Sequence, residues 1–194
     1  GVRALNDVDC YDVRAGAWEP LAPLQHSRHG AVVVVAASVA YVCGGHDDIT
    51  VLNSVERYDT ALQQWTFSPS MLVPRHGAVG AALSRPSLDS FGDSRLSLYI
   101  CGGHDGEHSL ASVETFDVSA QKWTPAASMA EHREGAGAVV MHGCLYILGG
   151  LNDERRALSS VEWYDPRSNS WESASPMLTS RAFLTVSPAL QRAL

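Results

Sequence analysis

The chain has 194 residues, 45% of them hydrophobic, which is enough for one domain with a sizeable core. Its 21 acidic and 14 basic side chains give a formal charge of −7, which argues against nucleic acid or an anionic membrane as a partner, because both attract clusters of Lys and Arg. No apolar run reaches membrane-spanning length and no secretory signal opens the chain, so we expect a soluble, cytoplasmic protein.

One spacing occurs four times along the chain. An aromatic residue is followed by Asp, then by a Trp seven residues after the aromatic, and then by an Arg ten residues after the Trp. The four copies are Tyr11, Asp12, Trp18 and Arg28; Tyr58, Asp59, Trp65 and Arg75; Phe116, Asp117, Trp123 and Arg133; and Tyr164, Asp165, Trp171 and Arg181. A repeat in the high forties with short apolar strands predicts a β-propeller of four-stranded antiparallel blades.

Each repeat contains four predicted strands. The first, small and β-branched, covers 30–35, 77–83 and 135–141; the second covers 39–43, 96–101 and 144–148. The second ends at a double glycine, Gly44-Gly45, Gly102-Gly103 or Gly149-Gly150, where backbones can approach closely. The third carries Ser-Val-Glu-x-Tyr/Phe-Asp at 54–59, 112–117 and 160–165, and the fourth opens on the Trp. We expect blade-against-blade packing from the aromatic residues Tyr58, Trp65, Phe116, Trp123, Tyr164 and Trp171.

These elements define an all-β chain that forms a partial propeller arc, with three complete blades and parts of two others. Residues 1–187 are the propeller fragment: the last two strands of one blade lie in 1–24, complete blades in about 25–71, 72–129 and 130–177, and the start of the next blade in 178–187. Residues 188–194 form a divergent tail. An insertion at 84–95, rich in Ser, Asp and Pro, predicts a flexible loop between a first and a second strand.

The double glycine after an apolar strand, the Val-Glu-x-Tyr-Asp motif and the Trp seven residues after the Tyr resemble the kelch repeat, most closely as in the Kelch-like (BTB-BACK-kelch) proteins. The resemblance covers nearly all of residues 6–183. It implies a six-bladed propeller, of which this is a fragment, in a longer protein. It also implies a non-catalytic adaptor that captures a protein client while an upstream BTB domain recruits a cullin for ubiquitin transfer. The alternative is a cytoskeletal protein, because other kelch proteins bind actin.

The loops that join the fourth strand to the first, and the second to the third, emerge at the same end of the blades. The candidate partner-binding residues on them are Arg28, His29, His46, Asp47, Arg75, His76, His104, Asp105, Arg133, Glu134, Leu151, Asn152 and Arg181. The repeated guanidiniums could bind carboxylates of an acidic or loop-presented client segment, and in Kelch-like adaptors the matching positions contact acidic motifs. Alternatively they pair with a repeated acid, Glu56, Glu114 or Glu162, and serve the fold.

Metal and enzyme functions are not expected. His29, His46, His76 and His104 could share a face with Asp47 and Asp105, but they belong to different blades and lack zinc-site spacing. The four cysteines, Cys10, Cys43, Cys101 and Cys144, also lack it. Cys43 and Cys101 occupy the same repeat position just before the double glycine, and we interpret these two as small buried hydrophobes in a reducing compartment. The chain has no nucleophile elbow, phosphate loop or triad motif, and its tyrosines are used at repeat positions rather than in a copper-oxidase ligand set. We therefore expect no cofactor.

Overall fold

The computed structural model describes residues 3–86 and 94–187, and within them the chain is all-β. Its strands are β1 (Asp9–Asp12), β2 (Ala17–Pro20), β3 (Val32–Ala36), β4 (Val39–Cys43), β5 (Val55–Asp59), β6 (Gln64–Ser68), β7 (Val79–Pro86), β8 (Ser94–Cys101), β9 (Val113–Asp117), β10 (Lys122–Ala126), β11 (Gly137–Met141), β12 (Cys144–Leu148), β13 (Val161–Asp165) and β14 (Ser170–Ala174). No helix of the length and apolarity that a membrane span requires occurs in these residues.

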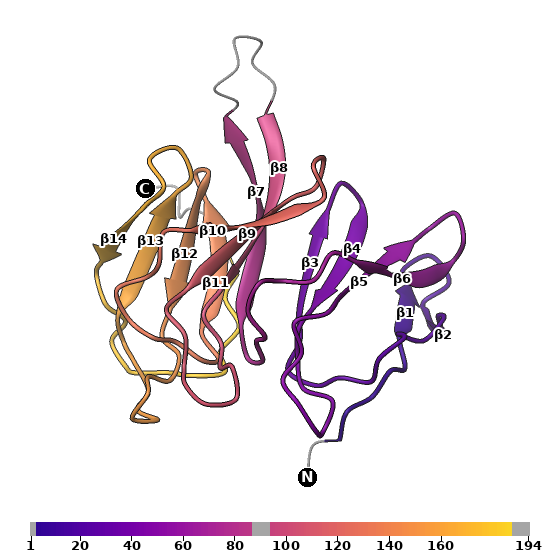
Figure 1. Ribbon diagram of the computed structural model, residues 1–194, viewed down its shortest axis with the longest axis horizontal. Helices are drawn as coiled ribbons and strands as arrows, with labels where there is room; N and C mark the ends of the chain where they lie inside the picture. The colour runs from indigo at the N-terminus through magenta and orange to yellow at the C-terminus, as the bar shows by residue number, and fades with distance from the viewer. Residues whose placement is uncertain (1–2, 87–93, 188–194) are drawn as a thin grey trace.

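The strands form one two-stranded sheet, β1-β2, and three four-stranded antiparallel sheets, β3 to β6, β7 to β10 and β11 to β14. The first strands of successive sheets contact one another, β3 against β7 and β7 against β11, and the fourth strands lie farther out (Figure 1). The sheets follow one another as the blades of an open arc. The predicted all-β class, with three complete propeller blades and parts of others, is confirmed.

Some element boundaries differ from the prediction. The first strands begin two residues later, at 32, 79 and 137, because Gly30, Gly77 and Gly135 have φ near +60° and leave the extended conformation. Their peptide groups bond between blades instead: Gly77 N donates to Gly30 O at 2.8 Å, and Gly135 N to Gly77 O at 2.8 Å. The fourth strands of the complete blades begin one residue before the Trp. These glycines therefore belong to the contact between blades.

Two predicted segments differ from the regular blade pattern. Residues 178–187, expected to start the next blade, form no strand, although 184–186 line the same hollow as parts of β3, β7 and β11. Of the insertion at 84–95, the structure shows that β7 continues to Pro86 and that β8 starts at Ser94. The middle of that insertion and the tail at 188–194 lie outside the described residues.

The aromatic pairs pack one blade against the next. Within each blade the third-strand aromatic lies opposite the Trp, with ring centroids 5.3 Å apart for Tyr58–Trp65, 4.9 Å for Phe116–Trp123 and 5.1 Å for Tyr164–Trp171. Trp123 Nε1 donates to the carbonyl of Pro69, and Trp171 Nε1 to that of Ala127, each at 2.7 Å. Both acceptors follow the last strand of the preceding blade, so the predicted blade-against-blade role is confirmed.

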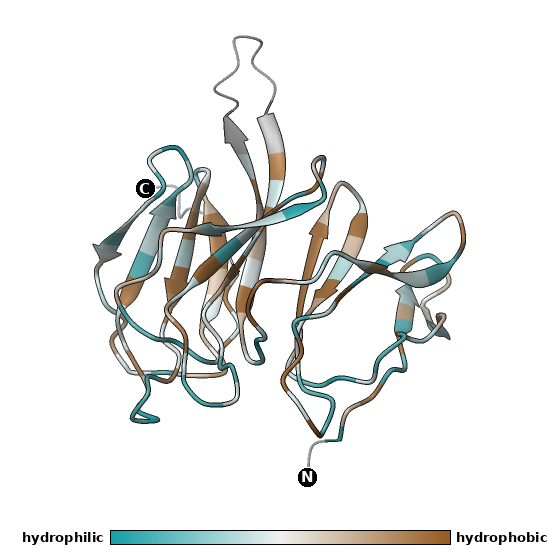
Figure 2. Cartoon of the chain, viewed as in Figure 1, coloured by the Kyte–Doolittle hydropathy of each residue, from teal (hydrophilic) through white to brown (hydrophobic). Residues whose placement is uncertain are grey.

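The hydrophobic core lies between blades rather than at one centre. One buried cluster joins Val34, Tyr41 and Cys43 to Leu98 and Phe116 of the next blade, and a second joins the following pair of blades in the same way. Figure 2 shows hydrophobic residues along β3, β4 and β12 and hydrophilic ones in many of the loops. Burial raises the pKa of both Cys43 and Cys101 to about 12, which agrees with their interpretation as small buried hydrophobes.

The double glycine connects each blade to the next. The backbone N–H of the second glycine donates to the carbonyl of the repeated Arg in the following blade. The distance is 2.8 Å both for Gly45 to Arg75 and for Gly103 to Arg133. The first glycine has a positive φ, and a Cβ on Gly102 would lie 2.4 Å from the Arg133 carbonyl oxygen. The position therefore needs glycine both for its backbone conformation and for the close approach of the neighbouring chain.

Substitution of Gly102 should separate these two requirements. Gly102→Ala combines left-handed strain of about 1–2 kcal/mol with an overpacking cost of roughly 1–3 kcal/mol. The control Gly143→Ala has the same strain, because Gly143 also has positive φ, but an added Cβ there meets nothing within 4 Å. Urea denaturation should show a clearly larger loss of unfolding free energy for Gly102→Ala. Equal losses would mean that the close approach has no energetic importance.

Candidate recognition face

The two predicted loops are held side by side in every complete blade. The residue after the repeated Arg forms a β-bridge with the residue after the double glycine, and the pairs are His29 with His46, His76 with His104, and Glu134 with Leu151. Each bridge has two backbone hydrogen bonds of 2.7–3.0 Å. The loops lie at the lower end of the arc in Figure 1. The predicted convergence of these loops at one end is confirmed.

The repeated arginines do not line this face. The side chains of Arg28, Arg75 and Arg133 are 2%, 0% and 0% exposed. They pair with the third-strand acids of their own blades at 2.6 Å for Glu56, 2.9 Å for Glu114 and 3.0 Å for Glu162. The expectation that these guanidiniums meet a client's carboxylates is corrected, because their donors are used inside the blade. The alternative, pairing with a repeated acid, is confirmed.

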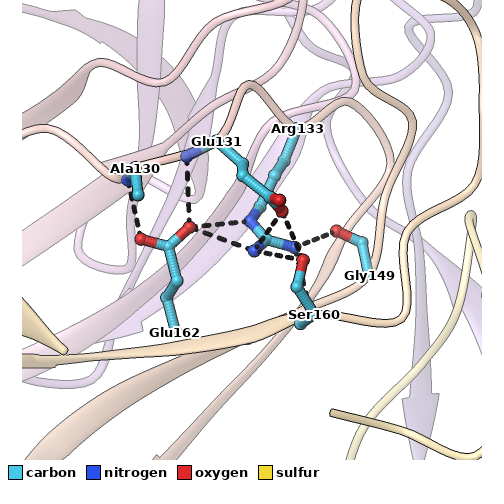
Figure 3. A network of polar contacts seen from close by, with 6 residues as sticks. All are labelled: Ala130, Glu131, Arg133, Gly149, Ser160 and Glu162. Carbon is cyan, nitrogen blue, oxygen red and sulfur yellow. Dashed lines mark hydrogen bonds and ion pairs between the residues drawn. The ribbon is translucent and has the colours of Figure 1, made fainter. Parts of the chain in front are cut away.

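The network around Arg133 shows how each unit is completed (Figure 3). The Arg133 guanidinium donates to the carbonyl of Gly149 at 2.7 Å, to Ser160 Oγ at 2.8 Å and to Glu162 Oε1 at 3.0 Å. The Glu162 carboxylate also accepts the backbone N–H groups of residues 130 and 131, at 2.7 and 3.3 Å. The ion pair therefore connects the double glycine, the third strand and the loop that enters the blade.

Arg181 differs from the other three. It is exposed, its Nε donates to Thr179 Oγ1 at 3.1 Å, and its carbonyl accepts the N–H of Gly150 at 2.8 Å. It makes no ion pair with any carboxylate in the described part of the chain. Arg181 therefore remains a candidate for partner binding.

Four imidazoles form a continuous row on the face, which we call the histidine row. The ring centroids of His29 and His46 are 5.3 Å apart, those of His46 and His76 are 6.0 Å apart, and those of His76 and His104 are 5.3 Å apart. The sequence indicated that these side chains could share a face, but not that they touch. The sequence signal for the shared face was that the four histidines occupy equivalent positions in two repeats. Their contact also depends on the hydrogen bond between Gly30 and Gly77, which the sequence does not show.

Carboxylates lie beside two rings of the histidine row, the first and the third. Asp48 Oδ1 is 3.7 Å from His29 Nε2, and Glu134 Oε1 is 4.0 Å from His76 Nδ1. Both acids have other partners, because Asp48 accepts the N–H of Ala4 at 3.0 Å and Glu134 pairs with Arg155. Sequence reasoning missed the Arg155 contact, since no other blade has an Arg at that point of the loop.

Hydrogen bonds select one tautomer for two of the rings. The backbone N–H of Asp48 donates to His46 Nδ1, and that of Gly106 donates to His104 Nδ1, each at 3.0 Å. A neutral imidazole has only one proton, so in both rings that proton lies on Nε2 and makes Nε2 a donor. Burial lowers the pKa of His76; Glu134 opposes this shift, whereas the nearby rings of His104, His46 and His29 add to it.

The same hydrogen bonds argue against a metal centre. His29, His46 and Asp48 bring possible ligand atoms within 4.8 Å of one another, and all three belong to one blade rather than to different blades. A cation would need a free lone pair on His46, but Nδ1 already accepts a backbone N–H and Nε2 carries the proton. These residues therefore do not fit a metal ion in the observed arrangement.

The other predicted residues mainly shape the loops. Asp47 accepts the N–H groups of Ile49 and Thr50, and Asp105 accepts those of Glu107 and His108, at 2.7–2.9 Å. These bonds lower the pKa of both aspartates and keep them charged. Asn152 fixes its own loop in a similar way, by accepting two backbone N–H groups through Oδ1.

Removal of a buried guanidinium should unfold the arc rather than weaken binding. Arg75→Met leaves Glu114 charged, 3% exposed and without its cation, which should cost about 3–5 kcal/mol of unfolding free energy. The control Arg181→Met removes an exposed guanidinium and should cost less than about 1 kcal/mol. Denaturant titration of both variants checks this. A native-like stability for Arg75→Met would contradict a structural role for the pair.

Comparison with known proteins agrees with the geometry. A family model described as the Kelch motif matches residues 27–72, 97–130 and 132–178. Kelch-like protein 23 of Pongo abelii is 29% identical over 147 residues, which are 74% of this chain and 24% of that protein. Alpha-scruin of Limulus polyphemus is 26% identical over 191 residues, covering 73% of this chain and 21% of that protein.

A viral relative and a solved structure extend the comparison. The "Kelch repeat and BTB domain-containing protein 1" of cowpox virus is 26% identical over 147 residues, 74% of this chain and 24% of that protein. The chain thus spans about a quarter or less of the length of these curated relatives. The solved structure of YjhT has the same fold, with a TM-score of 0.75 and 16% identity over 93% of this chain and 65% of that one. The resemblance predicted from the motifs is confirmed, and the chain belongs to the kelch-repeat family.

Proposed function

We propose that the face formed by the paired loops is a non-catalytic protein-recognition surface. The observation that carries this proposal is that each blade combines a repeated structural frame, its Arg–Glu unit and double glycine, with loop positions on the face whose side chains vary. The Arg–Glu units and double glycines repeat from blade to blade, whereas the bridged positions beside them carry His and His, His and His, then Glu and Leu. A constant frame that presents different side chains at equivalent points is suited to selecting a partner.

The fuller proposal is that the chain is the client-binding kelch region of a BTB-kelch adaptor for a cullin-RING ubiquitin ligase, acting in the cytoplasm. Two of the relatives carry Kelch-like or Kelch repeat and BTB names, which supports this reading. The client contributes a loop-presented segment that lies across the blades. The upstream BTB region, rather than this chain, contacts the cullin. The alternative is binding to actin filaments.

Substitutions at exposed loop tips should test the face without disturbing the frame. Ile49 is 85% exposed in the loop between β4 and β5, on the proposed face. Leu62 is 62% exposed in the turn between β5 and β6, at the opposite end, and serves as the matched control. In affinity capture with the full-length protein, Ile49→Asp should reduce client recovery at least about tenfold, the effect of roughly 1.4 kcal/mol. Leu62→Asp should leave recovery unchanged, and both variants should retain the cullin.

The same variants distinguish the alternatives. Clients that persist with Ile49→Asp but disappear with Leu62→Asp would place recognition at the other end of the arc. Sedimentation with filamentous actin tests the cytoskeletal function. If the wild-type protein sediments with filaments and Ile49→Asp abolishes this, the face binds actin, and the ubiquitin-ligase proposal fails unless cullin is also recovered.

A further inference from the structure

We propose that the histidine row binds a carboxylate of the partner segment, with an affinity that rises as the pH falls from 8 to 6. This inference rests on the proposed recognition face and specifies the chemistry of one part of it. In this proposal the histidine row, and not the buried arginines, binds the acidic group of the partner.

The positions of the rings indicate where the carboxylate would lie. His76 is the third ring of the row, between His46 at 6.0 Å and His104 at 5.3 Å. Both of these neighbours have their Nδ1 occupied by a backbone N–H, so each offers Nε2–H as a donor. A carboxylate placed over His76 would therefore have neutral donors on both sides and a titratable ring beneath it.

The charges around His76 explain why an added anion has a large effect. The titratable groups near it are His29, His46, His104 and Glu134, and Glu134 is already paired with Arg155. In the free protein, burial and the neighbouring rings outweigh the attraction of Glu134, and the pKa of His76 is lowered. His76 can therefore take up a proton, but the carboxylate beside it, Glu134, is already shared with Arg155 and does not hold that proton strongly.

Proton linkage then gives the direction of the pH dependence. A bound carboxylate favours the charged imidazole and raises the pKa of His76 relative to the free protein. Binding takes up a proton at any pH between the lower free value and the higher bound value. The affinity gain is complete below the free pKa and is lost as the pH rises through the bound pKa.

Blocked hexaglutamate is the probe, with blocked hexalysine as the control for charge sign. Isothermal titration of the full chain at pH 6 and pH 8, at equal ionic strength, should give tighter binding of hexaglutamate at pH 6, and a one-unit rise in one pKa limits this gain to about tenfold. Repeating the pH 6 titration in buffers of different ionisation enthalpy should show net proton uptake. Hexalysine should show no gain at pH 6.

Two variants assign the effect to the row. His76→Gln keeps a polar side chain but cannot become charged, and it should remove the pH dependence. His142→Gln is the matched control, because His142 is an exposed histidine in the turn between β11 and β12, at the other end of the blade. It should behave as the wild type does. Thermal melts establish that both variants are folded.

Long-range nitrogen–proton NMR of histidine provides a measurement that does not depend on affinity. It should show the proton of His46 and His104 on Nε2 at pH 8, and the titration of His76 should move to higher pH when hexaglutamate is added. Equal affinity at both pH values, unchanged pH dependence in His76→Gln, or a proton on Nδ1 of His46 would overturn the inference. Loss of clients with Ile49→Asp alongside any of these results would leave the recognition face intact and reject only the carboxylate site.

Discussion

One arginine in each blade holds both that blade and the one before it. The Arg75 guanidinium bonds to Gly102 and Glu114 of its own blade, while its backbone carbonyl accepts the N–H of Gly45 from the preceding blade. The side chain is almost completely shielded from water, so an unpaired charge there would cost several kcal/mol. Full use of its donors removes that cost and makes the conformation of the loop entering the blade depend on this one contact.

The buried Arg–Glu pair also fixes the segment that crosses between blades and the aromatic contacts beside it. Glu114 accepts the N–H groups of Leu72 and Val73, so the segment that crosses from one blade to the next has a defined path. The aromatic pairs then meet between blades, as Tyr41 does with Phe116 at 6.0 Å between ring centroids. Burial of hydrophobic side chains between blades supplies the main driving force for folding, but the polar units determine which surfaces face each other.

The sequence was sufficient to predict the propeller blades but not to predict whether the repeated arginines are buried or exposed. Regular spacing of Trp, Asp and Gly-Gly predicts blades because each strand of a blade needs its own turn and packing residues. An Arg two residues before a Gly fits equally well on a surface or in a buried ion pair, and only the position of Glu114 in three dimensions decides between them. The sequence pattern predicts the first-strand start two residues early, because Gly30 continues the apolar pattern but its positive φ keeps it out of the strand. The contact between His46 and His76 depends on two blades meeting, which lies beyond any pattern within one repeat.

The backbone hydrogen bonds that Gly77 donates to Gly30 and that Gly135 donates to Gly77 affect any molecule that lies on the arc. They give the histidine row nearly the same separation across the border of two blades, 6.0 Å, as within each blade, 5.3 Å. To an extended ligand the surface therefore has no seam at that border. The peptide groups of Gly30, Gly77 and Gly135 thus set the distance between equivalent positions of successive blades. Because these contacts are made by the backbone, side chains on the face can be exchanged without changing that distance.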